Sequence, residues 1–205
     1  MKFDIINFDG AKQGEVSLAK EVFGLESRAD LMHRYVMWQE QNGRVKTAHT
    51  KGRSDVAYST KKIVRQKGSG GARHGDRGVN LFRGGGVTFG PRLHTVSHSM
   101  PKKVRVLAIK TALSTKATAK QLTILDEAKL NEVKTKQLSA DLTKLGLANA
   151  LFVVDSVDEK FALSARNIPH VKVIPSSALN VYDILKAENL VITKDALSLI
   201  EARYK

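Results

Sequence analysis

The basic residues of this chain are gathered in one internal segment, and this distribution limits what the chain can fold into. Between Arg44 and Arg105 there are 15 Lys and Arg residues and two acids, Asp55 and Asp76, so these 62 residues carry a net charge of +13. The other 143 residues carry +1, and ten of the 15 glycines also lie in the basic segment. Like charges repel and glycine loses much conformational freedom on ordering, so the segment should form no compact core of its own.

Outside the basic segment, short runs of β-branched residues alternate with helical patterns. The runs of the last third read QLTILD, ALFVVD, VKVI and LVIT. The helical patterns between and after them cover residues 135–145, 158–167, 180–187 and 194–203. Strands that alternate with helices form βαβ units, which predicts an α/β fold with a mainly parallel sheet and helices on both faces. We expect the N-terminal run MKFDIINF to join this sheet.

Two further helices are expected on either side of the basic segment. Residues 27–42 have helical spacing, Ser27 with Asp30 resembles a capping box, and Gly43 is a suitable stop. The run PKKVRVLAIKTALS, which begins at Pro101, indicates an amphipathic helix, although VRVLAI alone would also suit a strand.

These boundaries predict a globular α/β domain of residues 1–43 and 102–205, interrupted by an extended loop of residues 44–101. A loop of this length without helices or strands is unusual, and such loops are mostly functional or disordered. Ordering it costs about 1–2 kcal/mol per residue, or about 60–120 kcal/mol in all. Its scattered apolar residues cannot offset that cost in the free protein, whereas contacts with an external polyanion can.

A phosphate-binding loop in an enzyme is one alternative for the stretch KGSGGARHGDRG. Gly70 and Gly75 have the spacing of a Walker loop, G-x-x-x-x-G-K-[ST]. Asp76 and Arg77 then stand where the lysine and the hydroxyl residue belong. The dinucleotide pattern G-x-G-x-x-G requires a glycine where Arg73 stands, and no credible strand precedes the stretch. A nucleotide-binding enzyme is therefore a poor fit.

RNA binding fits the same residues better. Glycines let the backbone approach a phosphate chain closely, and arginines form bidentate bonds with phosphates and stack on bases. Tyr58, Phe82 and Phe89 supply planes for unstacked bases. A solvated linker is the plainer alternative, but the attachment of both ends to one domain disfavours it. The residues expected to bind RNA are Arg44, Lys46, Lys51, Arg53, Lys61, Lys62, Arg65, Gln66, Lys67, Gly68, Gly70, Gly71, Arg73, His74, Arg77, Arg83, Gly84, Gly85, Gly86, Arg92, Lys102, Lys103 and Arg105.

Other kinds of site find little support, and we expect no catalytic residue, metal or cofactor. Cysteine is absent, which excludes thiolate metal sites. His94 and His98 have i, i+4 spacing, but the zincin glutamate and a nearby third ligand are missing, so phosphate contact or exposure is the simpler role. Asp126 and Asp155 end predicted strands, where α/β enzymes often carry catalytic groups, but capping of the next helix or turn is the simpler role.

A membrane partner is also not expected. The N-terminus meets acids within its first residues, unlike a signal peptide, and no apolar run approaches the length needed to span a bilayer.

Three motifs in order, RQKGSGGARHG, FRGGGVTFGPR and MPKKVRVLAIKTALS, resemble the bacterial form of the family of large-subunit ribosomal protein number four. The family pattern is Q-K-G-[ST]-G-x-A-R-x-G, then R-G-G-G-x-x-[FW]-G-P, then P-K-K-x-R-x-x-A. The matching residues are Gln66, Lys67, Gly68, Ser69, Gly70, Ala72, Arg73 and Gly75, then Arg83, Gly84, Gly85, Gly86, Gly90 and Pro91, then Pro101, Lys102, Lys103, Arg105 and Ala108. The chain departs from the family at Val64, usually an aromatic, and at Gly78, Val79 and Asn80, usually Arg-Ser-Pro.

The resemblance implies a structural protein of the large ribosomal subunit, in the cytoplasm or in an organelle. Members of the family bind large-subunit rRNA early in assembly, and their globular domain stays near the outer surface of the particle. The loop tip helps to form the narrowest part of the nascent-peptide exit tunnel, opposite large-subunit protein twenty-two. The resemblance therefore places Lys67, Gly70 and Arg73 at a constriction that the nascent peptide passes and near which macrolide antibiotics bind. Some members also repress their own operon through its mRNA leader, and the residues do not distinguish this added role from rRNA binding.

Overall fold

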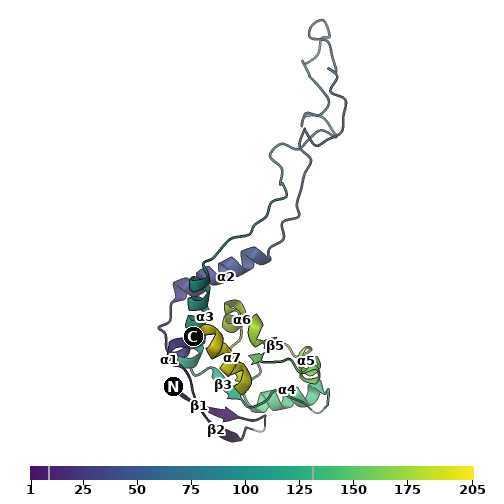
Figure 1. Cartoon of the computed structure of the whole chain (residues 1–205). Coiled ribbons are helices and arrows are strands. Elements are labelled where there is room, and N and C mark those ends of the chain that lie inside the picture. The colour runs from purple at the N-terminus through teal and green to yellow at the C-terminus, as the bar shows by residue number, and fades with distance from the viewer. Residues whose placement is uncertain (9, 131) are drawn as a thin grey trace. The chain divides into compact units, whose positions relative to one another are not determined.

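A computed structural model describes residues 1–8, 10–130 and 132–205, and the chain divides into two compact units. The first unit comprises Met1–Glu40 and Ser99–Lys205, and the second comprises Gln41–His98. All regular β-structure among the described residues belongs to the first unit (Figure 1).

The elements follow one another in the predicted order. In chain order they are β1 (Lys2–Ile6), β2 (Lys12–Ser17), α1 (Lys20–Phe23), α2 (Ala29–Gly43), α3 (Lys102–Thr118), β3 (Leu122–Leu125), α4 (Thr135–Lys144), β4 (Ala150–Val154), α5 (Glu159–Ala165), β5 (Val171–Pro175), the 3-10 turn η1 (Ser176–Ala178), α6 (Val181–Lys186), β6 (Asn189–Thr193) and α7 (Lys194–Tyr204). The strand β2, the short helix α1 and the 3-10 turn η1 are added to the predicted elements.

The six strands form one mixed sheet in the order β2-β1-β3-β6-β4-β5. The strands β1, β3, β6, β4 and β5 are each parallel to the next in this order, and only β2 is antiparallel to its neighbour, β1. Where β4 pairs with β6, Leu151 lies opposite Leu190 and Phe152 lies opposite Val191. The prediction of a mainly parallel α/β sheet is confirmed.

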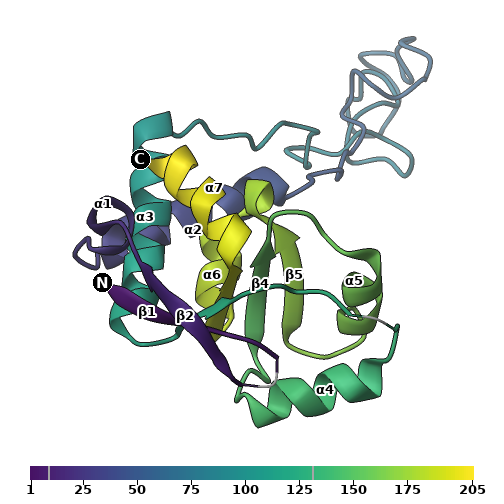
Figure 2. The same ribbon diagram turned by 60° about the horizontal axis from the view of Figure 1, so that its bottom comes forward.

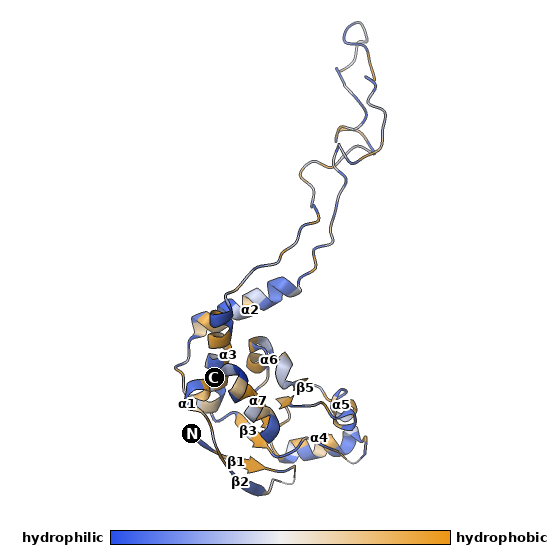
Figure 3. Cartoon of the chain, viewed as in Figure 1, coloured by the Kyte–Doolittle hydropathy of each residue, from blue (hydrophilic) through white to orange (hydrophobic). Residues whose placement is uncertain are grey.

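Helices cover both faces of the sheet, as the βαβ pattern predicts (Figure 2). Every residue of β4 is buried, but alternate side chains point to opposite faces. Leu151 and Val153 join the core cluster that contains residues of α1, α2, α3, α6 and α7. Phe152 and Val154 join the cluster that contains residues of α4 and α5. In Figure 3 the strands labelled β1 and β3 show orange, the colour of hydrophobic residues.

The strand β2 and the short helix α1 are elements that the sequence did not predict. The sequence of β2, KQGEVS, is almost wholly exposed, so hydropathy carries no strand signal. It pairs with β1 as the edge of the sheet, where Lys2 lies 3.3 Å from Glu15 and Lys12 pairs with Asp4. Charged side chains on an edge strand oppose pairing with another chain.

The predicted capping box before α2 was wrong. The helix begins at Ala29, and the hydroxyl of Ser27 accepts a hydrogen bond from Thr115 at 3.1 Å. The carboxylate of Asp30 pairs with Arg28 at 2.8 Å. The expected stop at Gly43 agrees with the last residue of the helix, and the run after Pro101 is helical, not a strand. Among the described residues, no helix combines the length and apolar character needed to cross a membrane.

Candidate nucleic-acid interface

The chain of the second unit folds back on itself without forming a helix or strand beyond Gly43, over residues that the structure describes in full. Backbone bonds join its two halves at two levels. The N–H of Thr50 donates to the carbonyl of Pro91, and the N–H of Val87 donates to the carbonyl of Lys51; each donor–acceptor distance is 2.9 Å. Farther along the chain, the N–H of Ile63 donates to the carbonyl of Gly75 at 2.8 Å. This last bond closes the stretch 63–75, which we call the tip.

Both acids of the second unit are bound to arginines of the same unit. The carboxylate of Asp76 is buried, accepts a bond from Arg53 at 2.6 Å, and also accepts from the backbone N–H of Gly78 at 3.1 Å. The carboxylate of Asp55 pairs with Arg92 at 2.7 Å. The N–H of Gly52, and secondarily Arg92, lower the pKa of Asp55, so this group remains charged at neutral pH. The only two acids therefore hold the fold-back together, and they offer little repulsion to a polyanion.

Gly78, where the chain departs from the family pattern, is closely packed against an aromatic ring. The ring of Tyr58 lies against this glycine so closely that a Cβ at position 78 would fall within the ring. The Tyr58 hydroxyl in turn accepts a bond from Arg53 at 3.4 Å. Gly86 is packed equally closely, against the backbone of Arg53. A side chain at either glycine would therefore displace the Arg53 region.

The tip is held by its own arginines. Arg65 donates to the carbonyl of Gly68 at 2.7 Å, and Arg73 donates to that of Gln66 at 3.3 Å. Lys67 is exposed and makes no hydrogen bond or ion pair within the described part of the chain. Gly70 has a φ of +68°, and a Cβ there would meet open space. The backbone conformation, and not a lack of space, therefore favours glycine at this position.

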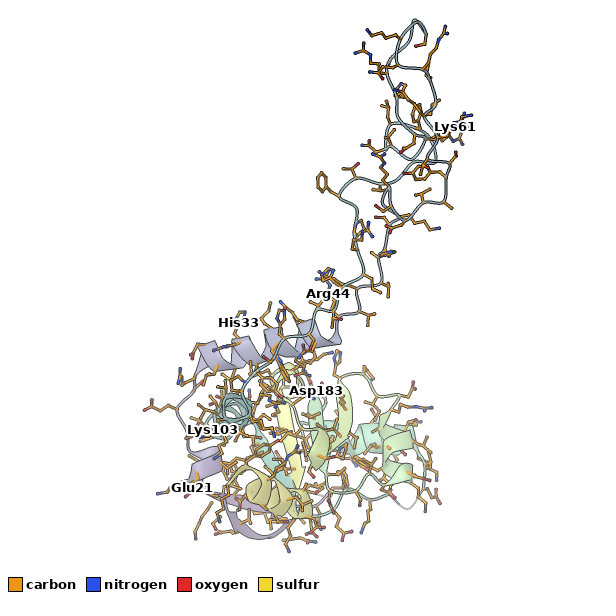
Figure 4. The ribbon with its side chains drawn as sticks, turned by 45° about the horizontal axis from the view of Figure 1, so that its top comes forward. Glu21, His33, Arg44, Lys61, Lys103 and Asp183 are labelled. Atoms are coloured by element: carbon orange, nitrogen blue, oxygen red, sulfur yellow. The ribbon has the colours of Figure 1, made fainter. Side chains whose placement is uncertain are left out.

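Most residues that the sequence predicts as RNA-binding are solvent-exposed. The exposed ones are Arg44, Lys51, Arg53, Lys61, Lys62, Arg65, Gln66, Lys67, Gly68, Gly70, Gly71, Arg73, Arg77, Arg83, Gly84, Arg92, Lys102 and Lys103. All but Lys102 and Lys103 belong to the second unit, and those two lie in the first turn of α3. Figure 4 labels Arg44 and Lys61 of the second unit, and Lys103.

Five predicted residues are partly or wholly covered. Gly86 is buried, and Lys46, His74, Gly85 and Arg105 are half-buried. The His74 ring packs edge-on against Phe82 with centroids 4.9 Å apart. The guanidinium of Arg105 lies over the Trp38 ring, 5.4 Å from its centroid, and its Nε is shielded from solvent. The spacing of basic residues could not reveal this, because a cation–π contact depends on the packing of α2 against α3.

The two histidines with helical spacing do not lie on a helix. His94 contacts Lys46 at 3.2 Å and the carbonyl of Arg92 at 3.0 Å, and His98 exchanges backbone bonds with the side chain of Asn42. In the described part of the chain no grouping of His, Cys, Asp and Glu could hold a metal ion.

The carboxyl ends of β3, β4 and β6 border a hollow of about 520 Å³ in the first unit. Asp126 and Asp155 line it, as their positions after strands suggest. The cap expected of Asp155 is supplied by Asp158, which accepts from the N–H of Phe161 at 3.0 Å.

Comparison with known proteins finds relatives of a single family that match over the full length of the chain. Residues 16–203 match the model described as the ribosomal protein L4/L1 family. A protein of Xanthobacter autotrophicus named large ribosomal subunit protein uL4 is 47% identical over 100% of both chains. Proteins of the same name from Methylobacterium radiotolerans and Methylocella silvestris are 48% and 46% identical, again over 100% of both chains. These names denote ribosomal proteins and not enzymes. The chain therefore belongs to the ribosomal protein L4/L1 family.

Proposed function

We propose that this chain binds large-subunit rRNA through residues 44–101 and the start of α3, supports early assembly of the subunit, and lines the nascent-peptide exit tunnel with its tip. As a family member it is a structural ribosomal protein of the large subunit, in the cytoplasm. Its further partners are then neighbouring subunit proteins, including protein twenty-two at the tunnel, and the nascent peptide.

One observation carries the proposal. Residues 41–98, all of them described, contain 12 Lys and Arg side chains and no buried apolar side chain. Both acids in this range are occupied by Arg53 and Arg92. A segment without an apolar core lacks the usual compensation for its ordering entropy, and bonds from its cations to phosphates supply an alternative.

We expect brief trypsin treatment of the free protein to cut first between Arg44 and Arg105, because local opening is cheapest where no apolar contact is lost. Mass spectrometry of the early fragments should locate the cuts there and leave the rest of the first unit intact. Added rRNA should slow these cuts selectively. Resistance of this segment in the absence of RNA would contradict the expectation.

Changes at the tip should alter sensitivity to macrolides, which bind in the tunnel nearby. Lys67→Glu places an anion among phosphates at an exposed position, and Gly70→Asp adds both an anion and a side chain at a φ of +68°. Both variants should shift growth across an erythromycin series while subunits still assemble. The measurements are the inhibitory concentration and the sedimentation profile of the subunits.

Two control variants separate the possible causes. Gly70→Ala introduces the backbone strain without the charge, and Lys136→Glu changes the charge equally at an exposed site on α4. Lys136→Glu should leave sensitivity unchanged. If both tip variants are incorporated normally and respond to erythromycin like the wild type, the tip does not line the tunnel.

A further inference from the structure

Phe89 combines two features that rarely occur together in an apolar residue. Its side chain is fully exposed, at 103% of the reference area. Its backbone has a φ of +55°, in the left-handed region that side chains larger than that of glycine seldom occupy. Exposure of a phenyl ring and left-handed backbone both cost free energy, and residues in such conformations are concentrated at functional sites.

The backbone around Phe89 is fixed on both sides. Val87 donates to Lys51, and Thr50 donates to Pro91 through both its N–H and its hydroxyl, at 2.9 and 3.2 Å. Residues 88–90 lie between these two bonds, whereas Thr50 and Lys51 on the opposite half are adjacent, so residues 88–90 form a bulge. Gly90 packs so closely on Thr50 that a Cβ would collide with its hydroxyl. The bulge is thus braced from behind, and the ring at its apex is presented to solvent.

The other two aromatic rings predicted to meet bases are already in use. The Tyr58 ring lies against Gly78, and the Phe82 ring packs on His74, so both are half-buried. Phe89 makes no ring contact with any described residue. It is therefore the aromatic ring of this unit with both faces open.

The charge around the bulge indicates what covers the ring. Lys51 and Arg92 flank the bonds that brace it, and both are exposed. Arg92 already pairs with Asp55, whereas Lys51 is in no ion pair with a described residue. An acidic partner is expected beside these cations, and a nucleic acid offers phosphates together with flat apolar faces. A protein pocket for Phe89 would instead have to bring apolar side chains into a segment that carries a large positive charge.

We propose that Phe89 is a stacking platform for one unstacked base of the rRNA. The proposal rests on the rRNA binding proposed above and adds a specific, uncharged contact to it. Stacking of a base on an aromatic ring tolerates any of the four bases, so Phe89 supplies affinity and position and does not read sequence.

The test uses the salt dependence of binding to large-subunit rRNA. At one salt concentration, Phe89→Leu should weaken binding by about 5- to 150-fold, because an aromatic–base stack is lost. The slope of log K against log salt should stay unchanged, since no phosphate contact is removed. Phe89→Tyr keeps the stack and should bind like the wild type. Leu81→Ala, at another exposed apolar residue of the unit, is the matched control and should have no effect.

A fluorescence reporter identifies what covers the ring. Because the chain has one tryptophan, Trp38→Phe combined with Phe89→Trp leaves a single indole at the bulge. Protein-free rRNA should quench this indole by stacking. Quenching that is absent with rRNA alone, together with a blue shift only in assembled subunits, would show that a protein pocket covers position 89 and overturn the proposal.

The outcomes also separate this proposal from the one on which it rests. Wild-type affinity that responds to salt, together with equal affinity of Phe89→Leu, overturns the stacking platform and leaves rRNA binding intact. Wild-type protein that fails to bind rRNA overturns both.

Discussion

Replacing Arg65, Lys67 and Arg73 together by alanine is expected to flatten the slope of log K against log salt for rRNA binding by about two to three units. Each lost phosphate contact removes about 0.7–0.9 from that slope, because fewer counterions are released on binding. The expected flattening makes the loss of affinity between 50 and 200 mM salt about 15- to 60-fold smaller than in the wild type. Filter binding or fluorescence anisotropy over this range measures it.

The structure predicts how this effect divides among the three residues. Lys67 has no partner within the described residues, so Lys67→Ala alone should remove about one contact and leave the tip folded. Arg65 and Arg73 each donate one bond to a tip carbonyl, and their remaining N–H groups stay available for phosphates. Their replacement should therefore loosen the tip as well, which increases the loss of affinity beyond the change in slope.

A charge-matched control separates specific contacts from the overall charge. Lys20, Lys136 and Lys186 are exposed lysines of the first unit, and their replacement by alanine lowers the net charge equally. This control should change the slope little. An unchanged slope in the tip variant would show that the three side chains do not touch phosphate.

Phe152→Ala is expected to destabilise the first unit by about 3–5 kcal/mol, the usual cost of removing a buried phenyl ring. Phe152 has no exposed area, lies at the middle of β4 between the neighbouring strands β5 and β6, and packs on the Phe161 ring with centroids 5.4 Å apart. Urea denaturation should show a lower midpoint with an unchanged m value, because the same surface is exposed on unfolding. Phe152→Leu retains most of the volume and should cost less.

The same variant tests whether the two units depend on each other. Under conditions in which its first unit is still folded, Phe152→Ala should keep the wild-type salt slope, because Phe152 contacts no residue of the basic segment. A loss of slope in this variant would mean that the sheet positions the phosphate contacts directly. A change in stability below about 1 kcal/mol would contradict the central place of Phe152 in the core.

Most of the α/β unit could be predicted from the sequence, because its signals are local and repeated. The runs that became β3, β4 and β6 are largely apolar and buried, which is typical of parallel strands covered on both faces, and helical patterns separate them. The run that became β5 lies at the edge of the sheet and includes the exposed Lys172. The strand β2 could not be found in this way. Its side chains are exposed, and it is a strand because β1 offers a free edge for its backbone.

In the basic segment, composition predicted the kind of partner but not the arrangement of the residues. Fifteen cations with two acids point to a polyanion whatever the fold. That Asp76 would be buried against Arg53, that Arg105 would lie over Trp38, and that Phe82 would be covered while Phe89 stays open depends on how distant stretches meet. Charge and periodicity are properties of neighbours along the chain and are readable in sequence. Pairing, burial and backbone handedness are settled only when residues far apart in the chain come into contact, and these decide which predicted side chains remain free to bind.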